Sequence, residues 1–361
     1  MSYDTFIDNR TPFDVQPHVQ LNADGQEVLV VMLSASFTAE ADGTVRPADE
    51  PLKVAYADVP MGDPALSSNR YEADIAPFKP MPEVLVTGSA HAPGGRPAAA
   101  VMVGLQIGAV RKLLQVTGDR LRHLGAYSQP HPFQTMPLIW ERTYGGTTGA
   151  GSVEQRNPVG IGHEGAHSAD PSVLSEVANI TRPDQVVNAA DARPEPVGFG
   201  PLGRGWRPRL ALAGTYDQAW LDQQWPLPPQ DLDPRYHLCA PLDQQSPSIG
   251  PGVTATLINM TPEGRWEFRL PRLTAPVRLF RGDAMEETEF RPDTVLIEPD
   301  LRRVTLKARL SFVIRRNSPR LREIMIGHVS PILLGARRRG KQYLNPTGSD
   351  GTHTEVPLWL P

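Results

Sequence analysis

The sequence predicts a mainly β protein with two sheet-rich, sandwich-like halves, long ordered glycine- and proline-rich loops between them, and few short helices. Apolar and polar residues alternate over many short segments, which is the period of a strand with one buried face. Proline (38) and glycine (31) are spread along all 361 residues, so turns are frequent and long helices are disfavoured. These observations together indicate sheets joined by elaborate loops.

The strands follow from local periodicity. Residues 304–314 give the clearest signal, because apolar side chains alternate there with mostly basic ones. The run from Val28 to Phe37 is almost wholly apolar, which is typical of a strand covered on both faces. Residues 101–107 and 112–117 alternate on either side of Gly108-Ala109, which predicts a hairpin. The other predicted strands are Val84–Ala90, Val253–Ile258, Trp266–Leu270, Val277–Phe280 and Thr294–Glu298.

Two short helices are predicted. Thr215 and Gln218 have the spacing of a capping box, so a helix is expected to begin there, with Trp220 and Leu221 facing the core. A second helix is expected over Ser172–Val177.

The strand groups divide the chain into four segments. These are an N-terminal β-rich half (1–145), a loop-rich connector (146–209), a C-terminal β-rich half (210–330) and a basic, proline-containing tail (331–361). Two independent domains and a single sandwich both fit this division.

Composition favours a cytoplasmic protein. Cys239 is the only cysteine, so no internal disulfide can form, as in reducing compartments. The first ten residues have no basic and apolar regions of the signal-peptide kind. The longest apolar run, Val28–Ala35, is too short to cross a bilayer, so we expect no membrane contact.

The charge is uneven. Twelve Lys or Arg and one acid, Glu323, lie between Arg302 and Lys341, although the whole chain carries a net charge of −4. An acidic partner, or a nucleic acid, is the expected ligand of such a segment. Nucleic acid is the less favoured of the two, because the basic residues of 303–309 form the outer, solvated face of a predicted strand and aromatic residues are sparse. Only Arg337, Arg338, Arg339 and Lys341 form a compact basic cluster.

Several irregular tracts stand out against this background: Gly62–Pro80, Glu141–Gly146, Arg156–Gly162 and Gly198–Pro226. With them, the chain from Asn9 to about Arg322 resembles a bacterial family of type VI secretion adaptors, which load toxic effectors onto the secreted spike. The resemblance implies a non-enzymatic protein whose partners are an effector and a spike-tip protein of the PAAR type. Met61 departs from the family pattern, which has an aromatic residue before Gly-Asp-Pro.

Nine residues of these tracts are the candidate motif or interaction residues: Arg70, Glu72, Asp74, Arg142, Asn157, Trp206, Arg209, Tyr216 and Trp220. The charged residues between 70 and 79 could be paired carboxylates for acid–base work, but an ion network that pins the loop is the favoured interpretation. Arginine forks and asparagine amides suit backbone carbonyls, either of this protein's own loops or of a partner.

A rival function is zinc peptidase activity. His163, Glu164 and His167 match H-E-x-x-H, in which two histidines one helical turn apart bind zinc and the glutamate is the general base. That chemistry requires a helix, and the glycines and prolines around the motif favour a polar surface loop instead. No third ligand is evident in sequence.

Two further patterns favour structure over chemistry. Gly198, Gly200 and Gly203 spell G-x-G-x-x-G, but neither a strand before it nor a helix after it is expected, so tight turns packed against Trp206 fit better than a dinucleotide site. Cys239 has no base beside it in sequence and is expected to be a small buried group. We therefore expect no cofactor, no metal and no catalytic residue. The favoured function is effector loading, with zinc peptidase and nucleic-acid binding as alternatives.

Overall fold

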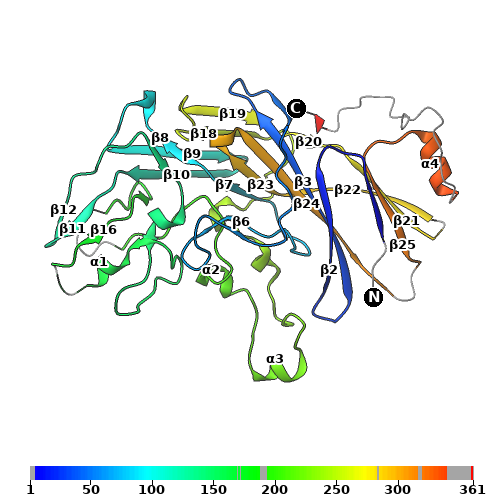
Figure 1. Ribbon diagram of the computed structural model, residues 1–361, viewed down its shortest axis with the longest axis horizontal. Coiled ribbons are helices and arrows are strands. Elements are labelled where there is room, and N and C mark those ends of the chain that lie inside the picture. The colour runs from blue at the N-terminus through cyan, green and yellow to red at the C-terminus, as the bar shows by residue number, and fades with distance from the viewer. Residues whose placement is uncertain are drawn as a thin grey trace.

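Sheets dominate the fold, as the alternation predicts. The computed structural model describes residues 5–168, 170, 172–187, 193–282, 284–315, 319–339 and 359–360. The largest sheet crosses the middle of the molecule in the order β2-β3-β24-β23-β7, with β4 paired to β3 (Figure 1). Its strands are β2 (Asp14–Leu21), β3 (Glu27–Ala39), β4 (Val45–Pro47), β7 (Glu83–Val86), β23 (Pro292–Glu298) and β24 (Arg303–Val313).

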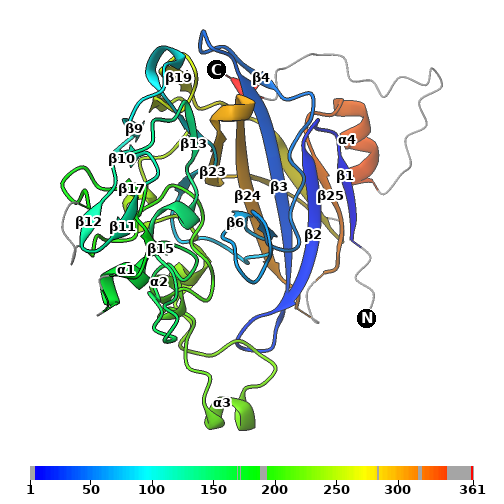
Figure 2. The same cartoon turned by 60° about the vertical axis from the view of Figure 1, so that its left-hand side comes forward.

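Two further sheets lie on opposite sides of the central one (Figure 2). The five-stranded sheet has the order β17-β10-β9-β18-β19, and the four-stranded sheet has the order β1-β25-β21-β22. The first contains β9 (Ala100–Ile107), β10 (Val110–Thr117), β17 (Ile180–Thr181), β18 (Thr254–Ile258) and β19 (Arg265–Arg269). The second contains β1 (Phe6–Asn9), β21 (Pro276–Arg281), β22 (Ala284–Glu289) and β25 (Leu321–Ile326).

Small ribbons and short helices complete the described chain. The ribbons are β5 (Val59–Pro60) with β6 (Asn69–Tyr71), β8 (Ser89–His91) with β13 (Thr135–Pro137), β11 (Leu121–His123) with β12 (Ala126–Tyr127) and β16 (Ser175–Glu176), β14 (Tyr144–Gly145) with β15 (Ile161–Gly162), and β20 (Arg272–Leu273) with β26 (Trp359–Leu360). The helices are α1 (His163–His167), α2 (Arg207–Leu210), α3 (Gln218–Gln223) and α4 (Pro331–Arg338). Single 3₁₀ turns occur at 93–95, 140–142, 234–237, 242–244 and 299–301.

One hydrophobic core runs through the three large sheets. It includes Phe37 of β3, Trp266 of β19 and Ile324 of β25, all of which are almost completely buried. Each of the two largest sheets combines strands from before residue 145 with strands from after residue 250. Chain order therefore does not decide which strands lie side by side, and hydrogen bonding between distant segments defines the layers.

The strand predictions are confirmed. Val28–Phe37 lies within β3, which is buried on both faces, and β9 and β10 form the predicted hairpin around Gly108. The predicted strand 84–90 is divided into β7 and β8. Burial on both faces explains why β3 shows no alternation.

The helix predictions need correction. Asp217, not Thr215, caps α3, because its carboxylate accepts the Trp220 N–H at 2.9 Å. Leu221 is 52% exposed, so this helix does not face the core. The predicted helix at 172–177 is extended instead, with β16 paired to β11. Cross-strand pairing outweighs the weak local preference there.

Candidate functional site

The tracts that stand out in the sequence converge in space. Ser68 donates from its N–H and its hydroxyl to the Glu141 carboxylate, at 2.7 and 2.9 Å. Trp206 lies edge-on to Trp140, with ring centroids 5.5 Å apart. The Asn157 amide donates to the Trp140 carbonyl at 2.9 Å. Segments 62–80, 141–146 and 156–162 thus meet the first part of 198–226, up to residue 213, at one place, which we call the tract junction.

Glu72 and Arg209 form the centre of the junction. The two guanidinium nitrogens of Arg209 donate to the two Glu72 oxygens at 2.6 and 2.8 Å. Arg209 also donates to the carbonyls of Leu202 and Tyr236, and Arg204 adds a second ion pair to Glu72 at 2.8 Å. Both partners of the central pair are almost fully buried. A fork of this geometry fixes the position of one loop relative to another.

A row of ion pairs joins segment 62–80 to β24. Lys307 Nζ lies 2.8 Å from the Asp74 carboxylate, and Arg309 pairs with Asp293 at 2.7 Å. Arg303 pairs with Glu298, which also accepts the Tyr71 hydroxyl proton at 2.6 Å. Arg70 lies at the edge of the row, 3.8 Å from Glu298 and 44% exposed.

These pairs correct one prediction. The basic face of residues 303–309 was expected to be solvated, but Lys307 and Arg309 are buried beneath segment 62–80. The strand pattern alone cannot show that a distant loop covers this face. The charges are neutralised within the protein, which leaves fewer of them for a nucleic acid. Arg337 lies 3.5 Å from Glu323, and Lys341 lies outside the described residues.

Another buried ion pair, Lys79 with Glu83, lies close to the Lys307–Asp74 pair. The Glu83 carboxylate also accepts the N–H groups of Cys239 and Ala240 at 2.8 Å. Burial opposes ionisation of Glu83, but Lys79 and these N–H groups outweigh it and lower its pKa. Burial raises the pKa of the Cys239 thiol, which is therefore protonated and unreactive. Cys239 is buried, as expected, among Leu85, Ala240 and Leu296, with the Glu83 carboxylate 3.4 Å from its sulfur.

Asn157, Trp206 and Arg142 hold the connector loops. The Asn157 amide donates to the Trp140 and Tyr144 carbonyls at 2.9 and 3.0 Å. Arg142 donates to Asp119 at 2.9 Å and to Asn179 at 3.2 Å. Within the described chain these side chains contact this protein's own backbone and loops, which fits the loop-bracing interpretation.

The glycine motif belongs to the same packing. Gly198 and Gly200 lie against the Trp140 ring, and a Cβ added to Gly203 would approach Trp206 Nε1 to 2.5 Å. These glycines permit close contact between backbone and indole, as the tight-turn interpretation requires.

The buried ion pairs at the centre of the junction leave almost no space for a substrate, although a more open hollow of about 800 Å³ lies at the surface, against Pro158, Arg207 and Leu210. A cavity of about 20 Å³ lies among Glu72, Asp74, Lys79 and Lys307, which is room for a single water. Nearby, burial and four surrounding cations lower the pKa of His237 to about 4. The chemistry of this arrangement is mutual neutralisation of buried charges, which stiffens the loops.

An arm leaves the junction and carries the two remaining candidate residues. Residues 214–231, with α3 at the tip, project from the body of the molecule (Figure 1). The side chains of Tyr216, Leu221 and Trp225 are 57, 52 and 66% exposed. Tyr216 stacks edge-on to Trp220, with ring centroids 4.7 Å apart.

The arm is held at its base and along one side. Thr215 donates its N–H and hydroxyl to Asp231 at 2.9 and 2.7 Å, which closes the base. Gln224 donates to the Ala23 carbonyl at 2.8 Å, which ties the arm to the turn between β2 and β3. Its exposed apolar side chains are therefore presented in fixed positions.

The H-E-x-x-H segment is not the surface loop that was expected. It forms α1, a single helical turn, with the His163 and His167 ring centroids 4.0 Å apart and His163 almost fully buried. His167 Nδ1 bonds to the His163 carbonyl, and Glu164 accepts the Gly149 N–H. Among the residues that the structure describes, no group of three His, Cys, Asp or Glu could hold a metal ion. A two-imidazole set without a third ligand does not complete a zinc site.

The sequence did not indicate three of these features. Arg204 and the Lys79–Glu83–Cys239 cluster depend on contacts between distant segments, and burial of the β24 charges depends on a covering loop. Exposure of the arm could have been anticipated from the absence of a full apolar stripe around α3.

Comparison with known proteins gives one match. The profile of a family described as "Uncharacterized protein conserved in bacteria (DUF2169)" matches residues 24–309, which is more than three quarters of the chain. No curated protein and no solved structure matched. In the described part of the chain, every helix is too short or too polar to cross a bilayer.

Proposed function

The chain belongs to this DUF2169 family, and from that premise we propose that it is a non-enzymatic cytoplasmic adaptor of type VI secretion. It binds an effector, or the PAAR-type domain at the spike tip, and holds it ready for loading onto the spike. The family description assigns no activity, so the secretion role rests on the resemblance of the four tracts.

The observation that carries the proposal is the contrast between junction and arm. The charged residues of the tracts are mostly paired inside the protein, whereas Tyr216, Leu221 and Trp225 are exposed on a braced arm. Exposed aromatic and aliphatic side chains of this kind serve as anchors in protein interfaces. Because the arm is pinned at its base and side, it loses little entropy on binding.

Co-expression with the effector and PAAR-type proteins encoded beside this chain tests the proposal. We expect a complex that survives gel filtration at 0.15 M and at about 0.5 M NaCl, because apolar anchors are insensitive to salt. Leu221→Ser and Tyr216→Ser should each weaken the complex about tenfold, which corresponds to the loss of one anchor.

Leu242→Ser is the matched control. Leu242 is 83% exposed but lies away from the arm, in a 3₁₀ turn, so its loss should leave the affinity unchanged. Failure of the wild-type chain to bind any of these proteins would refute the adaptor proposal. Equal weakening by all three substitutions would show that the arm is not the contact surface.

A further inference from the structure

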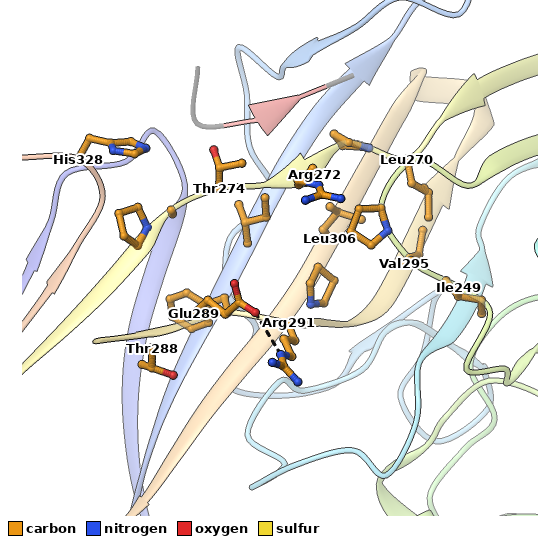
Figure 3. Close-up of a pocket in the computed structure, with 18 residues that line it drawn as sticks. Ile249, Leu270, Arg272, Thr274, Thr288, Glu289, Arg291, Val295, Leu306 and His328 are labelled. Carbon is orange, nitrogen blue, oxygen red and sulfur yellow. Dashed lines mark hydrogen bonds and ion pairs between the residues drawn. The ribbon is translucent and has the colours of Figure 1, made fainter. Parts of the chain in front are cut away.

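A large cavity lies away from the tract junction, where the three large sheets approach one another. It has a volume of about 640 Å³ and opens between β20, the start of β21, the link from β22 to β23 and the loop at 249–251 (Figure 3). This volume falls within the range of ordinary ligand sites. We call it the β20 groove.

The groove has an apolar floor. Leu270, Phe290, Val295 and Leu306 line it, and each is more than nine-tenths buried in the core. Its walls contain four prolines, which offer no N–H groups: Pro251, Pro271, Pro276 and Pro292. A floor and walls of this composition favour apolar side chains and disfavour a polar metabolite.

The polar side chains of the lining belong to residues that are partly or fully exposed. Arg272 and Arg291 are exposed at the rim, and Arg291 pairs with Glu289 at 3.3 Å (Figure 3). At one end, the buried Nε2 atom of His328 has no hydrogen-bond partner. A ligand with carbonyl oxygens and an acidic flank would satisfy these groups.

The groove borders a strand edge that accepts another strand. Arg272 and Leu273 of β20 pair antiparallel with Leu360 and Trp359 of β26. The last six residues of the sequence, 356–361, read Val-Pro-Leu-Trp-Leu-Pro and follow Glu355. The backbone beside the groove is thus already paired with an extended segment from an uncharged, largely apolar stretch.

We propose that the β20 groove is a strand-acceptor site for an extended apolar segment of a partner protein, flanked by an acidic residue. The partner segment adds to the β20 edge and places apolar side chains on the groove floor, while its acidic flank meets the rim arginines. The chain's own strand β26 competes for the same edge. This inference rests on the proposed adaptor function, since it assigns a second contact to the bound partner.

The test uses the full-length chain and a fluorescein-labelled peptide with the sequence of residues 355–361. Trp359→Pro combined with Leu360→Pro frees the edge, because whichever of the two N–H groups faces β20 is lost. Fluorescence anisotropy should show the peptide binding at least tenfold more tightly to this double-proline variant than to the wild type. A peptide with prolines at the same two positions should not bind.

Blocking the groove gives a matched pair of variants in the double-proline background. Gly250 lines the groove and Gly149 lies elsewhere, and a Cβ at either position meets no atom within 4 Å. Gly250→Trp should abolish peptide binding, and Gly149→Trp should not. Equal peptide affinity for wild type and double-proline variant, or binding that survives a folded Gly250→Trp, would overturn the inference.

If Gly250→Trp fails to fold, amide hydrogen exchange of the double-proline variant tests the strand addition instead. The Arg272 and Leu273 region should lose protection in the double-proline variant and regain it when the peptide is added. Unchanged exchange would refute strand addition. If the peptide does not bind but the effector complex is intact, only this inference is refuted. If the peptide binds but no effector complex forms, the adaptor proposal is refuted.

Discussion

Arg209→Met tests whether the buried ion pairs brace the tract junction. The substitution keeps an apolar side chain of similar length but removes the fork that holds both Glu72 oxygens at 2.6 and 2.8 Å. It also leaves the carbonyls of Leu202 and Tyr236 without this donor.

The expected loss follows from burial. Removing one partner of a buried ion pair costs about 3–5 kcal/mol, because the other charge remains buried. Arg204 still lies 2.8 Å from Glu72, so the lower end, about 3 kcal/mol, applies here. That is a large part of the roughly 5–15 kcal/mol that stabilises a typical domain.

Urea unfolding monitored by tryptophan fluorescence measures this loss. The matched control is Arg291→Met, whose partner Glu289 is exposed, with side chains 86 and 69% accessible. Exposed pairs contribute about 0–1 kcal/mol, so this control should hardly shift the midpoint. A loss below about 1 kcal/mol for Arg209→Met, or equal losses for both variants, would refute the bracing argument.

Three further predictions concern pH, packing and metal. The folded-state pKa of His237, about 4, lies below its unfolded value of 6.5, so the unfolded chain binds the extra proton first. Stability present above pH 6.5 is therefore lost as the pH falls towards 4, by at most about 3 kcal/mol, and thermal melts of His237→Gln should show a weaker decline over this window. Gly145→Ala should lower the free energy of unfolding by more than about 2 kcal/mol, because its Cβ would lie 2.1 Å from the Asn157 carbonyl oxygen and φ is +153°. The control Gly149→Ala should leave the free energy of unfolding unchanged, and equal urea midpoints for the two variants would contradict the prediction. Elemental analysis of purified protein should find far less than one zinc per chain, and the same amount in His163→Ala. That variant should nevertheless melt at a lower temperature, because His163 packs beside Tyr144. Stoichiometric zinc that is lost in His163→Ala would instead support the peptidase.

Local signals in the sequence predicted the strands well. A single strand determines such patterns locally: the alternation at 101–107 and 304–314, and the continuous apolar run at 28–37, depend only on which strand faces are buried. The capping pattern correctly predicted a short helix at α3 but not its cap residue or its exposure, and the weak helical preference at 172–177 was wrong, because no apolar stripe accompanied either signal. At 163–167 the flanking glycines and prolines suggested a loop, but the segment forms one helical turn, with His163 buried beside Tyr144.

The candidate residues also show what the sequence could and could not predict. Tract composition picked out Glu72, Asp74, Asn157 and Arg209, but not which residues pair with one another, since partners such as Asp74 and Lys307 lie up to 233 positions apart in the chain. Tyr216 and Trp220 were grouped with them, although they belong to the arm and not to the junction.

By itself, the sequence determined a β-rich chain with stiff, crowded loops, because residue period and proline content act over a few neighbouring positions. Only the tertiary structure decided which charges are buried, which apolar side chains face water and where a strand edge adjoins a cavity. These properties depend on what covers a surface, and here the covering segments come from distant parts of the chain.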